Sequence, residues 1–247
     1  MIKVEHKDNV AIITLDRANR RNALGSAMVE DLERRFAELD SETSVGAIVL
    51  TGAQPSFCAG SDLKELGTMN LAEMAEHEAI TAAVARKITF LNTPVIAAVE
   101  GHAFGGGFIL ACSCDLIVTS AAARWNLAEV PNGWLPPWGL QALVSRVGPV
   151  VAKRLTFGHE LLSGADVFRL GLADYVIDEG QSLEEAMRIA GLIAGMPQPA
   201  VASTKQFFAP LVAGPSEALD ASANRVFIDN CKHERAMATL ARFGAKA

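Results

Sequence analysis

The sequence predicts an α/β protein with a parallel βαβ core, followed by a helical C-terminal region. Up to about Pro149, short apolar segments rich in β-branched residues alternate with segments of helical periodicity. Beyond that point the pattern is mostly helical. Half of the 247 residues are hydrophobic, which is enough to bury a substantial core.

The first part of this alternation contains two strands and two helices. Residues 9–16 are predicted to form a strand, and residues 22–39 a helix, because their apolar residues recur at helical spacing. The uninterrupted β-branched run at 45–52 ends in glycine, as a strand covered on both faces does. The alanine-rich segment 71–91 is long enough to be a helix.

The second part repeats the same order of elements. Residues 93–101 are predicted to form a buried strand, with Pro94 at its start, where a missing N–H group is tolerated. A helix is expected over 108–114 and a further strand over 115–120. Strands separated by helices in this way form a parallel sheet.

Four helical segments are predicted after Pro149, at 150–158, 182–195, 199–213 and 217–244. No internal repeat, low-complexity tract or charged linker separates them from the core. We therefore expect a core over residues 1–195 and a helical region over 196–247, which packs on the core or on a neighbouring subunit.

Charge and cysteine usage exclude several classes of protein. The formal net charge of −6 argues against general nucleic-acid binding, which needs clustered Lys and Arg. The four cysteines follow neither a disulfide framework nor a metal-ligand spacing, so we expect reduced core thiols and no metal site. With no signal peptide and no stretch long and apolar enough to span a membrane, the sequence predicts a soluble cytoplasmic protein.

Three consecutive glycines stand in the segment GHAFGGGFILACSCDL, residues 101–116, between a predicted strand and a predicted helix. The segment lacks the spacing of a dinucleotide site and the Gly-Lys-Ser/Thr of a phosphate loop. Free N–H groups and the positive end of the helix dipole at this place suit an oxyanion. A tight strand-to-helix turn is the structural alternative.

A second turn, SFCAGSDLKEL at residues 56–66, follows the strand predicted at 45–52. Two strand ends in one parallel sheet can each offer one N–H group to the same oxygen atom, and such a pair stabilises an enolate or a tetrahedral oxyanion. Taken alone, either turn is more often a structural cap.

The motifs SFCAGSDLKE, TPVIAAVEGHAFGGGFILACSCDL and LLSGADVFRLGLADYVI, at these separations, resemble the crotonase superfamily, the enoyl-CoA hydratase/isomerase family. The resemblance implies a spiral ββα core over 1–195 and a C-terminal helical region over 196–247 that trimerises, giving a homotrimer or a dimer of trimers. It also implies an acyl-CoA thioester as substrate, with coenzyme A as part of that substrate and no permanently bound cofactor.

The same resemblance assigns roles to individual residues. The two oxyanion-hole N–H groups fall on Ala59 and Gly106, and a reshaped acyl pocket on the segment NGWLPPWGLQAL, which contains Trp134. The path of coenzyme A would be lined by Ala59, Gly60, Ser61 and Asp62, with Lys64 near its nucleotide end and Arg17, Arg20 and Arg21 as candidates for its phosphates.

Of the two catalytic glutamates of the family's hydratases, the resemblance places the first at Ile109 and the second at Glu129. Because Glu129 has apolar neighbours, we expect its pKa to be raised, so that it can take and return a proton near neutrality. An exposed loop glutamate is the structural alternative.

With one carboxylate missing, the sequence favours an enoyl-CoA isomerase, in which Glu129 alone moves a proton from C2 to C4 of a 3-enoyl thioester. A hydratase with an unusual water site is the alternative. Other enolate chemistry of the family, such as thioester hydrolysis, decarboxylation or dehalogenation, and an acyl-CoA-binding protein without catalysis also remain open.

Overall fold

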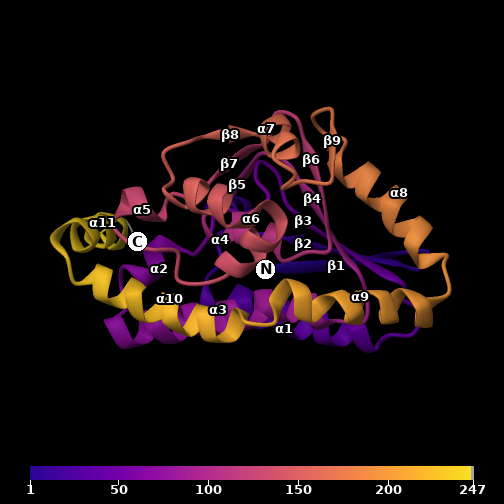
Figure 1. Ribbon diagram of the computed structural model, residues 1–247, viewed down its shortest axis with the longest axis horizontal. Helices are drawn as coiled ribbons and strands as arrows, with labels where there is room; N and C mark the ends of the chain where they lie inside the picture. The colour runs from indigo at the N-terminus through magenta and orange to yellow at the C-terminus, as the bar shows by residue number, and fades with distance from the viewer. Residues whose placement is uncertain (246–247) are drawn as a thin grey trace.

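The computed structural model describes residues 1–245, and its centre is a six-stranded sheet with the strand order β1-β2-β3-β4-β6-β9 (Figure 1). Its strands are β1 (Ile2–Lys7), β2 (Val10–Leu15), β3 (Ala47–Gly52), β4 (Val95–Val99), β6 (Leu116–Ser120) and β9 (Tyr175–Ile177). All neighbours from β2 onward are parallel, which confirms the predicted parallel core. Strand β1 was not predicted, and it pairs with β2 as an antiparallel hairpin.

A second, smaller sheet was also not predicted. It consists of β5 (His102–Phe104), β7 (Arg124–Asn126) and β8 (Leu162–Ser163). Strands of two or three residues are too short to show a period of two, so the sequence pattern does not reveal them. Strand β5 leads directly to the glycine triplet, so this small sheet fixes where the triplet lies.

The helices follow the predicted order, although three short helices were not predicted and the one predicted at 150–158 begins ten residues earlier. They are α1 (Ser26–Ser41), α2 (Leu63–Leu66), α3 (Leu71–Phe90), α4 (Gly106–Cys112), α5 (Glu129–Asn132), α6 (Leu140–Thr156), α7 (Gly164–Arg169), α8 (Ser182–Ala194), α9 (Gln198–Ala213), α10 (Ser216–Cys231) and α11 (Glu234–Gly244). The single helix predicted at 217–244 is divided at Lys232 and His233 into α10 and α11. The region after Pro149 is not purely helical either, because β8 and β9 lie within it.

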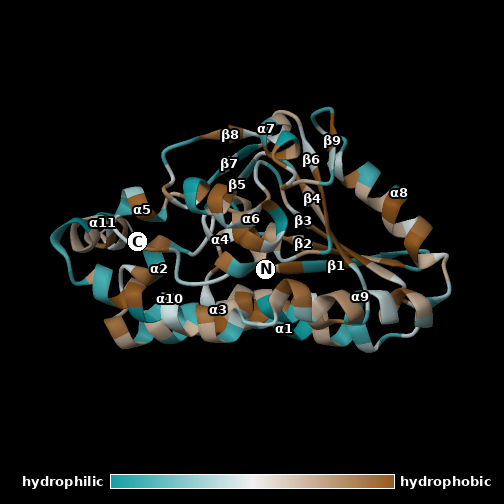
Figure 2. Cartoon of the chain, in the orientation of Figure 1, coloured by the Kyte–Doolittle hydropathy of each residue, from teal (hydrophilic) through white to brown (hydrophobic). Residues whose placement is uncertain are grey.

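Strand β3 shows how the sheet is covered on both faces. Successive side chains of a strand point to opposite faces, and those of Ala47 and Val49 pack toward α8, whereas Ile48 and Leu50 belong to the large core on the other face. The uninterrupted apolar run predicted for this strand is thereby explained. Most of the parallel strands are accordingly coloured toward brown in Figure 2, whereas β1 is partly teal, and α1, α3, α9 and α10 form a separate layer below them in Figure 1.

All four cysteines are buried and unpaired, as predicted. Burial raises the pKa of the thiols of Cys58, Cys112 and Cys231 to about 12, and that of Cys114 further still. Over residues 1–245, no helix combines the length and the hydropathy needed to cross a bilayer.

Candidate active site

A cavity of about 360 Å³ brings together the two turns that the sequence singled out. It lies where the turn after β3 meets the start of α4, and α3, α5 and the segment before α6 close its other sides. The lining includes Ala59, Gly60, Ser61, Glu78, Gly105, Gly106, Ile109, Glu129, Trp134 and Trp138. Ala59, Gly60, Ser61, Gly106, Glu129 and Trp134 had been predicted as site residues.

At each position of the triplet, a side chain would come too close to a neighbouring residue. Gly105 has φ of +52°, and a Cβ there would lie 2.9 Å from Oε1 of Glu129. A Cβ on Gly106 would lie 2.9 Å from Cζ2 of Trp138, and one on Gly107 would overlap the carbonyl of Cys58. The bare backbone therefore lets a carboxylate, an indole ring and a neighbouring turn approach the start of α4.

Two backbone N–H groups meet at this point. Gly106 is the first residue of α4, where an N–H group has no partner within the helix. A Cβ on Gly60 would lie 3.0 Å from the nitrogen of Gly106, and a Cβ on Gly106 would lie 3.5 Å from the nitrogen of Ser61. Within residues 1–245, neither Ser61 nor Gly106 donates a backbone hydrogen bond, so both can serve an oxygen in the cavity.

The predicted donor Ala59 is not available for this role. Its N–H group donates a hydrogen bond of 3.0 Å to the carbonyl of Arg21. Gly60, with φ of +88°, then redirects the chain, so that the next N–H group at the cavity is that of Ser61. The prediction placed this donor two residues too early, because motif spacing does not show which way each peptide of a turn faces.

Glu129 is the first residue of α5, and only 9% of its surface is exposed. Its Oε2 has no hydrogen-bond partner among residues 1–245. Burial, opposed by a backbone hydrogen bond and assisted by the nearby Glu78, raises the pKa of this carboxyl to about 7. The carboxyl can therefore exchange a proton near neutrality, and it is not the exposed loop glutamate of the structural alternative.

The structure adds a second carboxylate that the sequence reasoning missed. Glu78, on α3, is 2% exposed, and Trp138 donates a hydrogen bond of 2.7 Å from Nε1 to its Oε2. Burial raises the pKa of Glu78, whereas His77, Trp138 and the Ser61 side chain oppose this rise. The sequence does contain a signal, because Glu78 stands at helical spacing between Met74 and Ala82, which are both buried.

Two other cavity residues make part of its lining apolar. Ile109 lies in the first turn of α4, is 1% exposed, and offers no polar group. Trp134 stands edge-on to Phe227, with the ring centroids 6.1 Å apart. Position 109 and the segment that contains Trp134 and Trp138 therefore border the same cavity.

Asp62 and Lys64, predicted to bind coenzyme A, do not line the cavity. The Asp62 carboxylate instead accepts a hydrogen bond of 3.0 Å from the Lys64 backbone at the start of α2 and pairs with Arg17 at 2.7 Å. Asp62 is thus a helix cap that also fixes the Arg17 loop. Of the three candidate arginines, Arg21 reaches the cavity lining.

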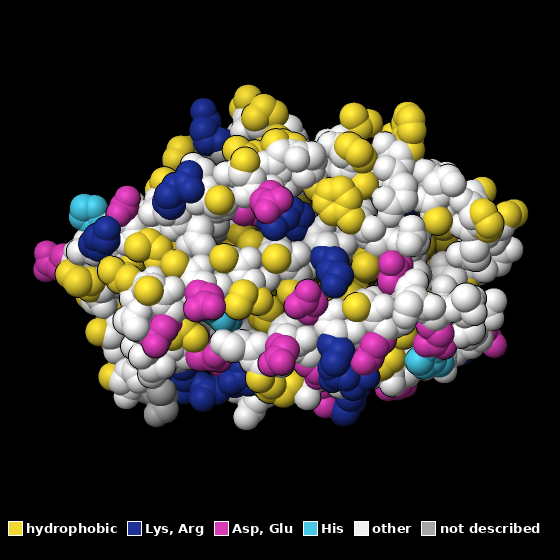
Figure 3. Space-filling model, turned by 90° about the horizontal axis from the view of Figure 1, so that it is seen from below, with side chains coloured by type: hydrophobic (Ala, Val, Ile, Leu, Met, Phe, Trp, Pro, Cys, Tyr) yellow, Lys and Arg dark blue, Asp and Glu magenta, His cyan; other side chains and the backbone are white. Residues whose placement is uncertain are grey.

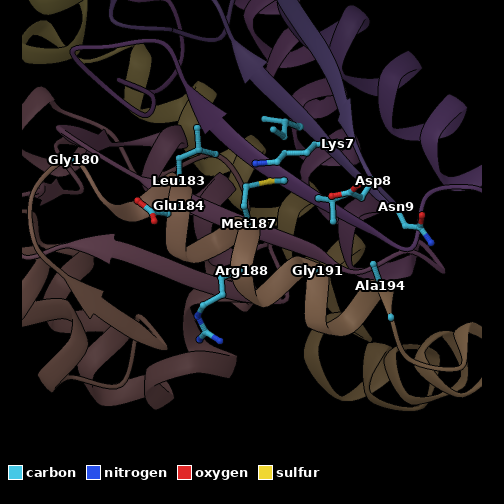
Figure 4. Close-up of a pocket in the computed structure, with 13 residues that line it drawn as sticks. Lys7, Asp8, Asn9, Gly180, Leu183, Glu184, Met187, Arg188, Gly191 and Ala194 are labelled. Carbon is cyan, nitrogen blue, oxygen red and sulfur yellow. The ribbon is translucent and has the colours of Figure 1, made fainter.

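A larger cavity of about 750 Å³ lies elsewhere, between α8 and the β1–β2 hairpin. Figure 4 shows Leu183 and Met187 extending from α8 toward Lys7, with Arg188 pointing the other way. Glu184 and Arg188 at this cavity are exposed to solvent, whereas Glu78 and Glu129 at the smaller cavity are buried. The chemistry is therefore concentrated in the smaller cavity.

Comparison with known proteins gives consistent results. The family model described as enoyl-CoA hydratase/isomerase matches residues 5–245. The chain is 35% identical over 205 residues to a short-chain-enoyl-CoA hydratase of Clostridium acetobutylicum, covering 82% of this chain and 78% of that protein. It is 32% identical over 206 residues to a crotonyl-CoA hydratase of Syntrophomonas wolfei, covering 83% and 79%. A crystal structure of an enoyl-CoA hydratase/isomerase from Mycobacterium paratuberculosis superimposes with a TM-score of 0.87 at 26% identity, covering 98% of this chain and 97% of that one.

Proposed function

Because the chain belongs to the enoyl-CoA hydratase/isomerase family and has its crotonase fold, we propose that it adds water to the double bond of a 2-enoyl-CoA thioester. The observation that carries the proposal is the unpartnered carboxylate oxygen of Glu129 in the same cavity as the N–H groups of Ser61 and Gly106. The sequence alone favoured isomerisation. Hydration is chosen here because the relatives reported above are named as hydratases.

The geometry suits a reaction through an enolate. The thioester oxygen would accept hydrogen bonds from Ser61 and Gly106, which stabilise the negative charge that develops when water adds at C3. The electron pair of the C2=C3 bond moves toward the thioester, and protonated Glu129 supplies the proton that C2 gains. The proton lost by the water replaces the one that Glu129 gave up, which returns the site to its starting state. A carboxyl with a pKa of about 7 is protonated often enough to act as this acid.

Isomerisation is the second candidate, and the apolar Ile109 is the observation that favours it. Moving a double bond needs one base, which removes a proton from C2 and returns it at C4 while the N–H groups hold the dienolate. Glu129 alone can do this, since both carbons lie on one acyl chain beside it.

One experiment separates these candidates from the others. The protein is offered 2-enoyl-CoA and 3-enoyl-CoA in parallel, and the absorbance of the conjugated thioester is followed together with the mass of the product. Gain of one water on 2-enoyl-CoA supports the proposal. Conversion of 3-enoyl-CoA to its isomer without water gain supports isomerisation instead. Tight binding of both thioesters with no product would identify an acyl-CoA-binding protein, and loss of the acyl group would identify other enolate or thioester chemistry.

A further inference from the structure

Glu78 brings a second carboxylate into the cavity from α3. It belongs to α3, whereas Ile109, at the position where hydratases of the family carry a glutamate, belongs to α4. Both residues line the same cavity, and both are almost completely buried. The acidic group that is absent at 109 is therefore present in the same space, on the opposite element.

A buried carboxylate is unfavourable unless hydrogen bonds compensate for its lost hydration. The N–H group of Trp138 provides one such bond at 2.7 Å, and the nearby Ser61 side chain also favours the ionised form. Glu78 is flanked at helical spacing by the apolar Met74 and Ala82, so an apolar residue would satisfy the packing of α3 equally well. Packing alone gives no reason for a carboxylate here.

The residues next to Glu78 also lie at the two N–H donors. The ring of Trp138 lies against Gly106, and Ser61 carries the other donor on its own backbone. Glu129 approaches from the side of Gly105. The two carboxylates are close enough to affect each other electrostatically. A thioester bound to both N–H groups would have one carboxylate on the Ser61 side and the other on the Gly105 side.

We propose that Glu78 is the second catalytic carboxylate of this site and binds the water that adds at C3. Because this rests on the proposed hydration, the step is written for that reaction. An O–H bond of the water breaks and its proton passes to Glu78, while the oxygen forms a bond to C3. The C2=C3 electron pair moves to C2 and the thioester, and Glu129 gives its proton to C2. A proton then passes from Glu78 to Glu129, which restores both groups with one water consumed.

Trp138 is a positioning residue in this scheme, since it touches Glu78 and the Gly106 backbone. Its hydrogen bond holds one carboxylate oxygen and leaves the remaining acceptor positions of Glu78 for water. The indole can hold this place because position 106 has no side chain.

The first test is Glu78→Gln, which keeps the size of the side chain and an acceptor for Trp138. General acid or base catalysis contributes about 100-fold or more, so kcat for hydration of 2-enoyl-CoA is expected to fall at least about 100-fold, with KM changed little. Exchange of the C2 protons of a saturated acyl-CoA with D₂O needs only Glu129 and the two N–H groups, so it should stay within about threefold of wild type. Glu76→Gln, two residues away and exposed, is the matched control and should change neither rate.

Two further variants keep the test decisive. In Glu78→Gln/Ile109→Glu, a carboxylate returns to the same cavity from α4, and hydration is expected to recover at least about tenfold over the single variant. Trp138→Phe leaves Glu78 in place but removes its donor, and it should lower kcat for hydration and shift its pH profile while C2 exchange continues. If thermal unfolding shows that Glu78→Gln does not fold, the result for Trp138→Phe decides whether Glu78 has the proposed role.

Three results would overturn the role of Glu78. They are hydration by Glu78→Gln within threefold of wild type, equal loss of hydration and C2 exchange in that variant, and unchanged hydration in Trp138→Phe. Failure of the proposed function has a different signature, because wild-type protein would then form no hydrated product from 2-enoyl-CoA.

Discussion

Ile109 and Gly139 are sterically complementary: Cγ2 of Ile109 occupies the space where a side chain on Gly139 would begin. Gly139, with φ of +74°, is the residue before α6, and Ile109 lies in the first turn of α4. Ile109, which stands where the resemblance implies a carboxylate, is therefore also part of the contact between α4 and the start of α6. Changing it alters packing and chemistry together.

Ile109→Glu should consequently destabilise the protein by several kcal/mol, because it loses an apolar contact and adds a carboxylate to a cavity that already holds two. The free energy of unfolding should fall further at pH 8 than at pH 5, since the added carboxyl group must ionise at pH 8. Urea unfolding at both pH values measures it. Ile109→Val, the matched control, should cost about 0.5–1.5 kcal/mol at either pH. Equal stability of Ile109→Glu and wild type at pH 8 would show that position 109 reaches solvent.

Glu129→Gln should abolish turnover while leaving acyl-CoA binding within a few-fold, because the amide keeps the shape but cannot exchange protons. Steady-state assays on both enoyl thioesters, together with calorimetric titration of a saturated acyl-CoA, measure the two effects. The exposed Glu76→Gln serves as control. Activity retained by the variant would remove Glu129 from the mechanism.

The pKa of Glu129 also predicts how stability depends on pH. The folded pKa is about 7 against an ordinary 4.5, so between these values the folded protein holds a proton that the unfolded chain has released. The contribution of this site to the free energy of unfolding is therefore fully present below about pH 4.5. It decreases by about 3 kcal/mol as the pH rises to 7. Glu129→Gln should be more stable than wild type at pH 8 by about that amount and equally stable at pH 4. The same stability difference at both pH values would contradict the raised pKa.

Gly106→Val should lower kcat about 100- to 1000-fold, corresponding to about 2.7–4 kcal/mol for one lost oxyanion donor. Its side chain would meet Trp138 at 2.9 Å and crowd the thioester oxygen. Gly191→Ala is a suitable control, because a Cβ on this α8 residue meets nothing within 4 Å. Unchanged kcat in folded Gly106→Val would place the oxyanion hole elsewhere.

The predicted trimer can be tested on α9, where Phe207 and Leu211 are 72% and 68% exposed. Seen from below, several hydrophobic side chains project along the upper edge of the molecule, whereas most charged ones lie across its middle and lower part (Figure 3). Light scattering after size-exclusion chromatography should show three or six chains. Phe207→Asp/Leu211→Asp should reduce the mass to that of a single chain if α9 lies in the interface, and wild-type monomers would refute the trimer.

The sequence predicts what depends on local periodicity. The strands β3, β4 and β6 and the helices α1 and α3 lie close to their expected bounds, because each strand is a continuous apolar run and each helix repeats one buried face. What it does not predict depends on contacts distant in the chain. The pairing of β5 with β7 is one case, and the hydrogen bond between Glu78 and Trp138, 60 positions apart, is another.

The same difference between local pattern and distant contacts holds for the site. Motif spacing led to Glu129 and Gly106, which the structure brings into one cavity. It misplaced the donor at Ala59, since the direction of a peptide within a turn depends on the φ of Gly60 and on the carbonyl of Arg21. It also assigned Asp62 to the substrate, although this carboxylate is engaged by Arg17 and the start of α2.

The buried thiols make the native chain well suited to site-specific chemistry. Because Cys58, Cys112, Cys114 and Cys231 are all shielded and their pKa values raised, maleimides or iodoacetamide would find almost no thiolate on the folded protein. A single cysteine introduced at an exposed position, such as Glu76→Cys, would then carry a fluorophore or spin label without removal of the natural ones. Distances within an assembled oligomer, and any movement of α3 when a thioester binds, become measurable in an otherwise unmodified enzyme.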